Sequence, residues 1–164
     1  MSTSEPDTQS TTARRSAEAE VRGLIGRLAP AHERLIGEVR RSLRKRLPTA
    51  HELVYEYRDC FVISYSPDDR GYEGVLALRA SADGVKLYFN RGKGLPDPEK
   101  VMRGSGNQTR WIQLEGASAL ALPALARLID EAIARSDVPF ARTGRGPVVI
   151  RSASSRKGRQ RRPA

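Results

Sequence analysis

EGVLALRASADGVKLYFN, residues 73–90, decides the fold class of this chain. Two alternating apolar runs flank a short spacer, and the Asp83–Gly84 pair in that spacer is a strong signal for a tight β-hairpin turn. ELVYEY (52–57), CFVISY (60–65) and RWIQL (110–114) are further runs typical of strands. Because most of the spacers are short, we expect an antiparallel meander.

Three stretches have the periodicity of amphipathic helices. The first runs from Ser16 toward Pro30, the second from Pro30 to Pro48, and the third from Pro123 to Ser136. Proline suits the first turn of a helix and stops a helix that precedes it. The pattern therefore predicts an α+β fold: an antiparallel sheet of about five strands, with two N-terminal helices and one C-terminal helix on one face.

The ends of the chain differ in composition from its centre. Residues 1–15 are polar and rich in serine and threonine, which predicts a disordered N-terminal extension. Residues 16–138 carry the helical and strand patterns and are expected to form the α+β domain. Residues 139–164 alternate small, polar and basic residues, which predicts a basic disordered tail.

Most of the net charge of +10 belongs to that tail. Its basic residues, with no acidic residue among them, are Arg142, Arg145, Arg151, Arg156, Lys157, Arg159, Arg161 and Arg162. Such a segment can release counterions from a phosphate backbone, so weak, non-specific nucleic-acid binding is one hypothesis. A solubilising arm is the alternative. The tail has no aromatic residues, so base stacking is not expected from it.

A second basic cluster lies near the end of the second helix, and its members are Arg40, Arg41, Arg44, Lys45 and Arg46. It is a candidate nucleic-acid patch. Cations at a helix C-terminus also interact favourably with the negative end of the helix dipole. That second explanation favours a solvated face.

Catalytic and metal-binding patterns are scarce. The chain has two histidines, His32 and His51, and one cysteine, Cys60, so neither a metal site nor a cofactor is expected. No Gly-x-Ser-x-Gly elbow accompanies them.

An enzyme remains the less favoured alternative. Glu52, Tyr55, Glu56 and Tyr57 lie on one predicted strand, and a buried glutamate there would have a shifted pKa. Alternate strand positions also serve ordinary core and solvent faces, and no substrate is indicated.

NRGKGLPDPEKVMRGSGNQTR, residues 90–110, is the loop richest in glycine and cations. Backbone N–H groups of such turns can form a concave anion site, and cationic side chains can add charge-assisted hydrogen bonds. The hypothetical ligand-binding residues are Arg91, Lys93, Arg103, Gly104, Ser105, Gly106, Asn107 and Arg110. The loop matches neither phosphate-loop pattern of nucleotide-binding proteins, so a turn that shapes the fold is the favoured alternative.

Two long segments resemble the YdhG-like family, a bacterial domain of unknown function. They are LIGEVRRSLRKRLPTAHELVYEY (35–57) and VKLYFNRGKGLPDPEKVMRGSGNQTRWIQL (85–114), and a final helix follows. The matching positions are Leu47, Pro48, Glu52, Glu56, Leu95, Asp97, Pro98, Gly104, Gly106 and Arg110. Asn107 stands where the family usually has lysine. The resemblance covers about residues 19–136 and implies a compact α+β domain with an antiparallel sheet, without implying an activity.

Together these patterns predict a small cytoplasmic binding module. The single cysteine favours a reducing compartment, and neither a signal peptide nor an apolar membrane span is expected. A small anion, a nucleotide, an acidic peptide or another protein partner is the expected ligand.

Overall fold

The computed structural model describes residues 9–71 and 73–151 and forms one six-stranded mixed sheet with three α-helices. Its helices are α1 (Thr11–Ile25), α2 (Pro30–Arg46) and α3 (Pro123–Ala134), with short 3₁₀ turns η1 (Gly92–Gly94) and η2 (Ala117–Ala121). Its strands are β1 (His51–Glu56), β2 (Cys60–Ser66), β3 (Leu76–Ser81), β4 (Gly84–Phe89), β5 (Arg110–Leu114) and β6 (Val148–Ile150). The strand order is β5-β4-β3-β2-β1-β6. The predicted α+β class is confirmed.

The hairpin of β3 and β4 forms where the sequence predicts it. Gly84 has φ +119°, which L side chains rarely adopt, and Ser81 Oγ accepts a hydrogen bond of 3.1 Å from the Asp83 N–H. Neighbouring strands from β1 to β5 pair antiparallel. The short connections therefore give the meander that their lengths predict.

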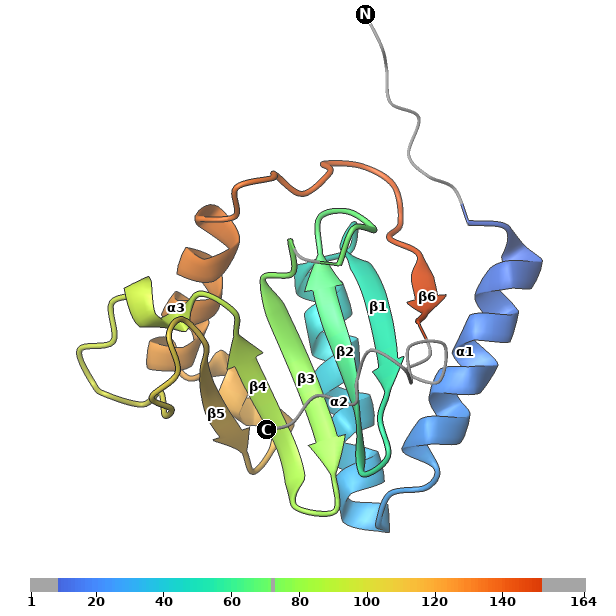
Figure 1. Cartoon of the computed structure of the whole chain (residues 1–164), viewed down its shortest axis with the longest axis horizontal. Coiled ribbons are helices and arrows are strands. Elements are labelled where there is room, and N and C mark those ends of the chain that lie inside the picture. Colours follow the sequence, from blue (N-terminus) through green and yellow to red (C-terminus); the bar gives the residue numbers. More distant parts are fainter. Residues whose placement is uncertain (1–8, 72, 152–164) are drawn as a thin grey trace, which may run out of the picture.

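The helices cover one face of the sheet (Figure 1). α2 and α3 lie behind the strands, and α1 lies beside β6 at the edge of the sheet. Val54, Ile63, Leu78 and Leu87 form a buried row across the middle strands on the helix-covered side. Within residues 9–71 and 73–151, no helix covers the opposite side of the middle strands (Figure 1).

β6 corrects the predicted number of strands. Residues 139–151 were expected in a disordered tail, but Val148–Ile150 pair parallel with Glu52–Val54 of β1. The Gly146 N–H also donates to the Pro48 carbonyl at 2.9 Å, and the Glu52 N–H donates to the Pro147 carbonyl at 2.9 Å. The tail prediction is therefore wrong for residues 146–151, because backbone hydrogen bonds to Pro48 and β1 hold them. Residues 152–164 lie outside the described residues.

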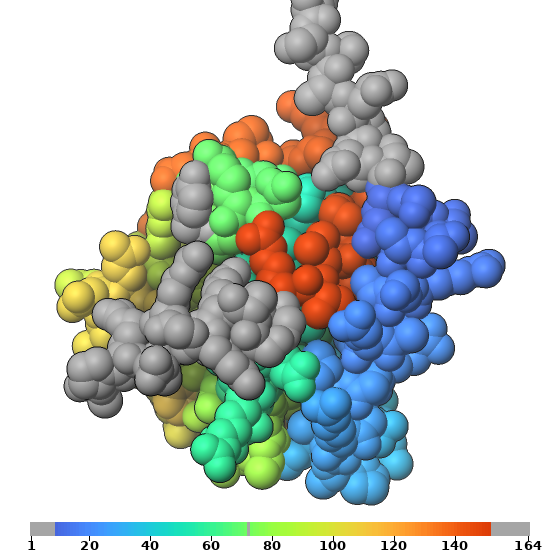
Figure 2. Space-filling model, turned by 45° about the vertical axis from the view of Figure 1, so that its right-hand side comes forward, coloured from blue at the N-terminus to red at the C-terminus, as the bar shows by residue number. Residues whose placement is uncertain are grey.

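The N-terminal prediction is also wrong for residues 9–15. Ser10 caps α1 by accepting a hydrogen bond of 3.1 Å from the Ala13 N–H. The Gln9 amide then pairs with both backbone groups of Val148, at 2.7 and 2.9 Å. Figure 2 shows α1 and β6 side by side on the surface. Residues 1–8 of the predicted extension lie outside the described residues.

None of the helices in residues 9–71 and 73–151 is long and apolar enough to cross a membrane.

Candidate functional site

A groove of about 830 Å³ lies between α1 and α2 and extends to the segment before β6. Glu18, Arg22 and Ile25 line it from α1, where their spacing places them on one side of the helix. α2 contributes the longest wall, and Arg145 and Gly146 contribute the third. The residues from α2 are Glu33, Arg34, Gly37, Glu38, Arg40, Arg41, Arg44 and Lys45.

A buried ion-pair cluster forms the floor of this groove. Arg40 donates two hydrogen bonds to each of two carboxylates: to Glu18 at 2.7 and 3.0 Å, and to Glu52 of β1 at 3.0 and 3.0 Å. Arg44 lies 3.0 Å from a Glu18 oxygen and 3.5 Å from a Glu52 oxygen. Only 8% of the Arg40 side chain and 3% of the Glu52 side chain is exposed. The cluster therefore fixes both helices to the sheet.

Tyr65 of β2 completes the cluster from inside the core. Its hydroxyl donates a hydrogen bond of 2.8 Å to Glu52, and its side chain is fully buried. Burial, reinforced by the neighbouring Glu52 charge, raises the pKa of Tyr65 well above its ordinary value. The phenol is therefore a fixed hydrogen-bond donor that keeps the Glu52 carboxylate in place.

Pairing decides the protonation states in the cluster. Burial alone would lower the pKa of Arg40, but the hydrogen bond to Glu18 and the Glu52 charge outweigh burial and raise it. Burial alone would raise the pKa of Glu18, but its hydrogen bonds and the charges of Arg40 and Arg44 outweigh that effect and lower it. Both groups therefore stay charged in the folded protein.

Replacing Glu18 by glutamine should weaken the dependence of stability on acid pH. The folded-state pKa of Glu18 lies below its ordinary value of 4.5, so its contribution is complete above about pH 4.5 and is lost as the pH falls through the folded-state pKa. Urea unfolding at several acid pH values measures this effect, with Glu20→Gln on the exposed side of α1 as the control. Equal acid sensitivity in the native protein and Glu18→Gln would contradict it.

The rim of the groove carries cations in excess. Besides Arg40 and Arg44, the lining cations are Arg22, Arg34, Arg41, Lys45 and Arg145, and none of these five makes an ion pair within the described residues. The lining contains seven cations against four carboxylates. The lining therefore has a net positive formal charge, which favours anions over cations in the groove.

Arg14 of α1 contacts Gly146, one of the residues that line the groove. Its Nη2 donates to the Gly146 carbonyl at 3.0 Å, whereas its Nη1 is buried without a hydrogen-bond partner among the described residues. Burial and the like charge of Arg145 lower the pKa of Arg14. Neither Arg14 nor Arg145 forms an ion pair with a carboxylate of the described residues.

The basic cluster of α2 is not one solvated face. Arg40 is buried, and Arg44 contacts the same two carboxylates as Arg40. Arg46 lies 2.5 Å from Asp130 of α3. The prediction of a solvated face is wrong for Arg40, because the inward-facing Glu52 needs a counter-charge. Arg41 and Lys45 are exposed as predicted.

The glycine-rich loop is exposed at all eight predicted ligand residues except Arg110, which is partly buried. The Arg110 guanidinium donates to the carbonyls of Gly106 and Thr109, at 2.7 and 2.9 Å. Arg91 pairs with Asp137 at 2.7 Å, so two of the predicted cations have partners within the protein.

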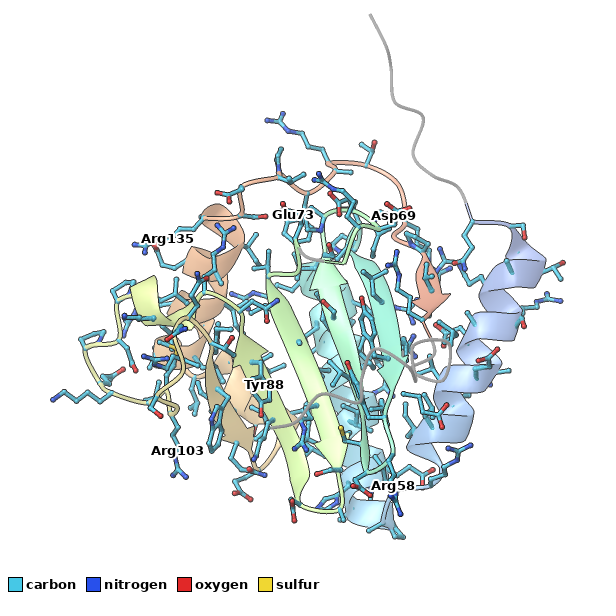
Figure 3. The ribbon with its side chains drawn as sticks, viewed as in Figure 1. Arg58, Asp69, Glu73, Tyr88, Arg103 and Arg135 are labelled. Atoms are coloured by element: carbon cyan, nitrogen blue, oxygen red, sulfur yellow. The ribbon has the colours of Figure 1, made fainter. Side chains whose placement is uncertain are left out.

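Arg103 and Trp111 set the shape of the same loop. Their backbones exchange hydrogen bonds of 2.8 and 2.9 Å, and Gly104 has φ +114° between this bridge and the loop tip. Arg103 lies beside β5 (Figure 3), with its guanidinium carbon 5.9 Å from the centre of the Trp111 ring. Lys93, Ser105, Gly106 and Asn107 are exposed, and ligand binding by this loop stays a prediction.

The described cations of the predicted tail lie in different places. Arg145 lines the groove, Arg142 is exposed, and Arg151 donates to the Asp69 carbonyl. The five others, Arg156, Lys157, Arg159, Arg161 and Arg162, lie outside the described residues.

The strand residues of the enzyme alternative do not share one pocket. Glu52 and Glu56 are on the helix-covered side of β1, and Tyr55 is on the other side because successive strand residues alternate. Glu56 pairs with Arg27 at 2.9 Å. No group of three or more His, Cys, Asp or Glu residues suited to a metal ion occurs in the described ranges.

Two members of the buried cluster, Glu18 and Tyr65, escaped prediction from the sequence. The usable signal was Glu52, which shares a strand face with Val54 and therefore points into the core. A glutamate in that position requires a cation, and Arg40 and Arg44 are spaced one turn apart on the neighbouring helix.

The chain was compared with protein-family models, with curated proteins and with solved structures. None of the three comparisons gives a match.

Proposed function

We propose that this protein is a binding module that holds a small, multiply charged anion in the groove between α1 and α2. The expected ligand class is a phosphate ester or a polycarboxylate. The observation that carries the proposal is the set of five rim cations without ion-pair partners in the described part of the chain, above a floor whose charges are already paired. A volume of about 830 Å³ suits a small molecule.

The buried cluster supports this proposal by making the groove rigid. Arg40 and Glu52 hold α2 against β1, and Glu18 ties α1 to the same point. A ligand then meets cations that are already positioned, so less conformational entropy is lost on binding. The groove is lined by three separate segments, namely α1, α2 and the segment before β6, whereas the glycine-rich loop is one continuous segment.

Replacing both Arg41 and Arg145 by alanine should weaken binding of pyrophosphate or citrate at least about tenfold, because each lost charge-assisted hydrogen bond contributes about 1.5–3 kcal/mol. Isothermal titration calorimetry measures the dissociation constants. The double variant Arg15→Ala, Arg142→Ala is the matched control, since it removes one exposed cation from α1 and one from the segment before β6, neither of which lines the groove. Equal affinities of the two double variants would contradict the assignment.

Two helix glycines offer a second matched comparison. A Cβ at Gly37 or at Gly23 would meet no atom within 4 Å, so both helices accept a side chain there. Of these two glycines, Gly37 lines the groove and Gly23 does not. Gly37→Glu should therefore reduce anion affinity strongly, while Gly23→Glu, with the same change in net charge, should reduce it little. The reverse order would place the anion elsewhere.

A further inference from the structure

The face of the sheet opposite the helices combines aromatic rings with cations. Two register rows define this open face: Leu53, Ser64, Ala77, Tyr88 and Trp111 form one, and Tyr55, Val62, Arg79, Lys86 and Gln113 form the other. Neither row contains aspartate or glutamate. Figure 3 shows Tyr88 in front of the strands, on the side without helices.

The aromatic and cationic side chains of the open face adjoin one another at β4 and β5. The Tyr88 and Trp111 rings lie 6.5 Å apart with a 35° angle between their planes. Lys86 Nζ lies 4.5 Å from the centre of the Trp111 ring, with the Arg103 guanidinium on the same ring at 5.9 Å. Arg79 is the direct cross-strand neighbour of Lys86. These like charges lie side by side without a carboxylate in either row.

We infer that the open face binds single-stranded nucleic acid, with bases on Tyr88 and Trp111 and phosphates at Arg79, Lys86 and Arg103. Aromatic rings stack on unpaired bases irrespective of sequence, and adjacent cations neutralise the phosphates between them. Leu53, Ser64 and Ala77 are buried, so the accessible part of this face includes the partly exposed Arg79, Lys86, Tyr88 and Trp111. Bases inside a duplex cannot reach such rings, so a single strand is the expected partner.

This surface is separate from the groove, which lies on the helix side of the sheet. It also differs from the tail hypothesis, which provides charge without stacking. Arg151 is the last described residue, and its N–H donates to the Val54 carbonyl at 2.7 Å, so Arg151 lies at the edge of the sheet opposite Trp111.

The single tryptophan of the chain, Trp111, provides a direct test on the full-length native protein. Titration with a single-stranded oligothymidine of about ten nucleotides should quench its fluorescence in a saturable way, since one such surface spans about 4–16 nucleotides. Duplex DNA of the same length should bind more weakly and quench less. Equal binding of the duplex, or of polyglutamate, without quenching would overturn the inference and leave only charge attraction.

Variants separate stacking from simple attraction. Tyr88→Ala should weaken strand binding at least about fivefold, while Tyr57→Ala, which removes an exposed tyrosine outside the two rows, should leave it unchanged. The double variant Arg79→Gln, Lys86→Gln should lower both the affinity and its salt dependence while keeping the rings. Replacing the five cations after Arg151 by glutamine should reduce affinity and preserve quenching at saturation. Binding that depends on those five cations and not on Tyr88 would contradict the assignment.

Discussion

Replacing Arg40 by methionine should lower the free energy of unfolding by about 3–5 kcal/mol, which is the usual cost of removing one partner from a buried ion pair. Four hydrogen bonds to Glu18 and Glu52 are lost, and the Glu52 carboxylate keeps only Tyr65 and the longer contact with Arg44. Urea or guanidinium unfolding at neutral pH measures the change.

The double variant Arg40→Met, Glu52→Met tests whether the loss of stability comes from an unpaired buried charge. It removes the buried charge together with its partner, so it should be more stable than Arg40→Met alone. The Tyr65 hydroxyl then lacks its acceptor, which keeps the recovery incomplete. An Arg40→Met variant less than about 1 kcal/mol below the native protein would show that the cluster does not hold the helices to the sheet.

Replacing Gly146 by alanine should destabilise the protein by about 3 kcal/mol or more and detach β6. A Cβ at this position would clash with the Ala50 carbonyl oxygen, and the neighbouring backbone cannot move away without breaking the Gly146–Pro48 hydrogen bond. Loss of hydrogen-exchange protection at Val148–Ile150 would report the detachment.

Gly106→Ala is the matched control for that variant. Its Cβ would meet only the Thr109 carbonyl oxygen at 3.9 Å, an ordinary contact. Its stability should therefore stay within about 0.5 kcal/mol of the native protein. Full protection of β6 in Gly146→Ala would contradict the close packing of this segment on Ala50.

Local chemistry made the centre of the fold predictable. The Asp83–Gly84 turn, the alternating strands and the proline-bounded helices need only neighbouring residues to be recognised. β6 depends instead on distant partners: Gln9, Pro48 and β1 order three apolar residues inside a basic segment. Composition alone therefore indicated disorder at both ends of the described chain.

The candidate site was predictable only in fragments. The sequence identifies Arg40 as part of a basic cluster and Glu52 as a glutamate on a strand. Their pairing, and the contributions of Glu18 and Tyr65, come from the packing of α1, α2 and the sheet. Spacing in the sequence predicts which charged residues share one face of a helix or strand. It does not predict which helices and strands pack together to form a groove.

Four glycines allow the central claim to be tested in one titration. Gly37 and Gly146 line the groove, whereas Gly104 and Gly106 belong to the glycine-rich loop. In an amide ¹H–¹⁵N NMR titration of the native protein with pyrophosphate, we predict saturable shifts at Gly37 and Gly146 and little change at Gly104 and Gly106. Saturable shifts confined to Gly104 and Gly106, or no saturable shift at any of the four, would contradict anion binding in the groove.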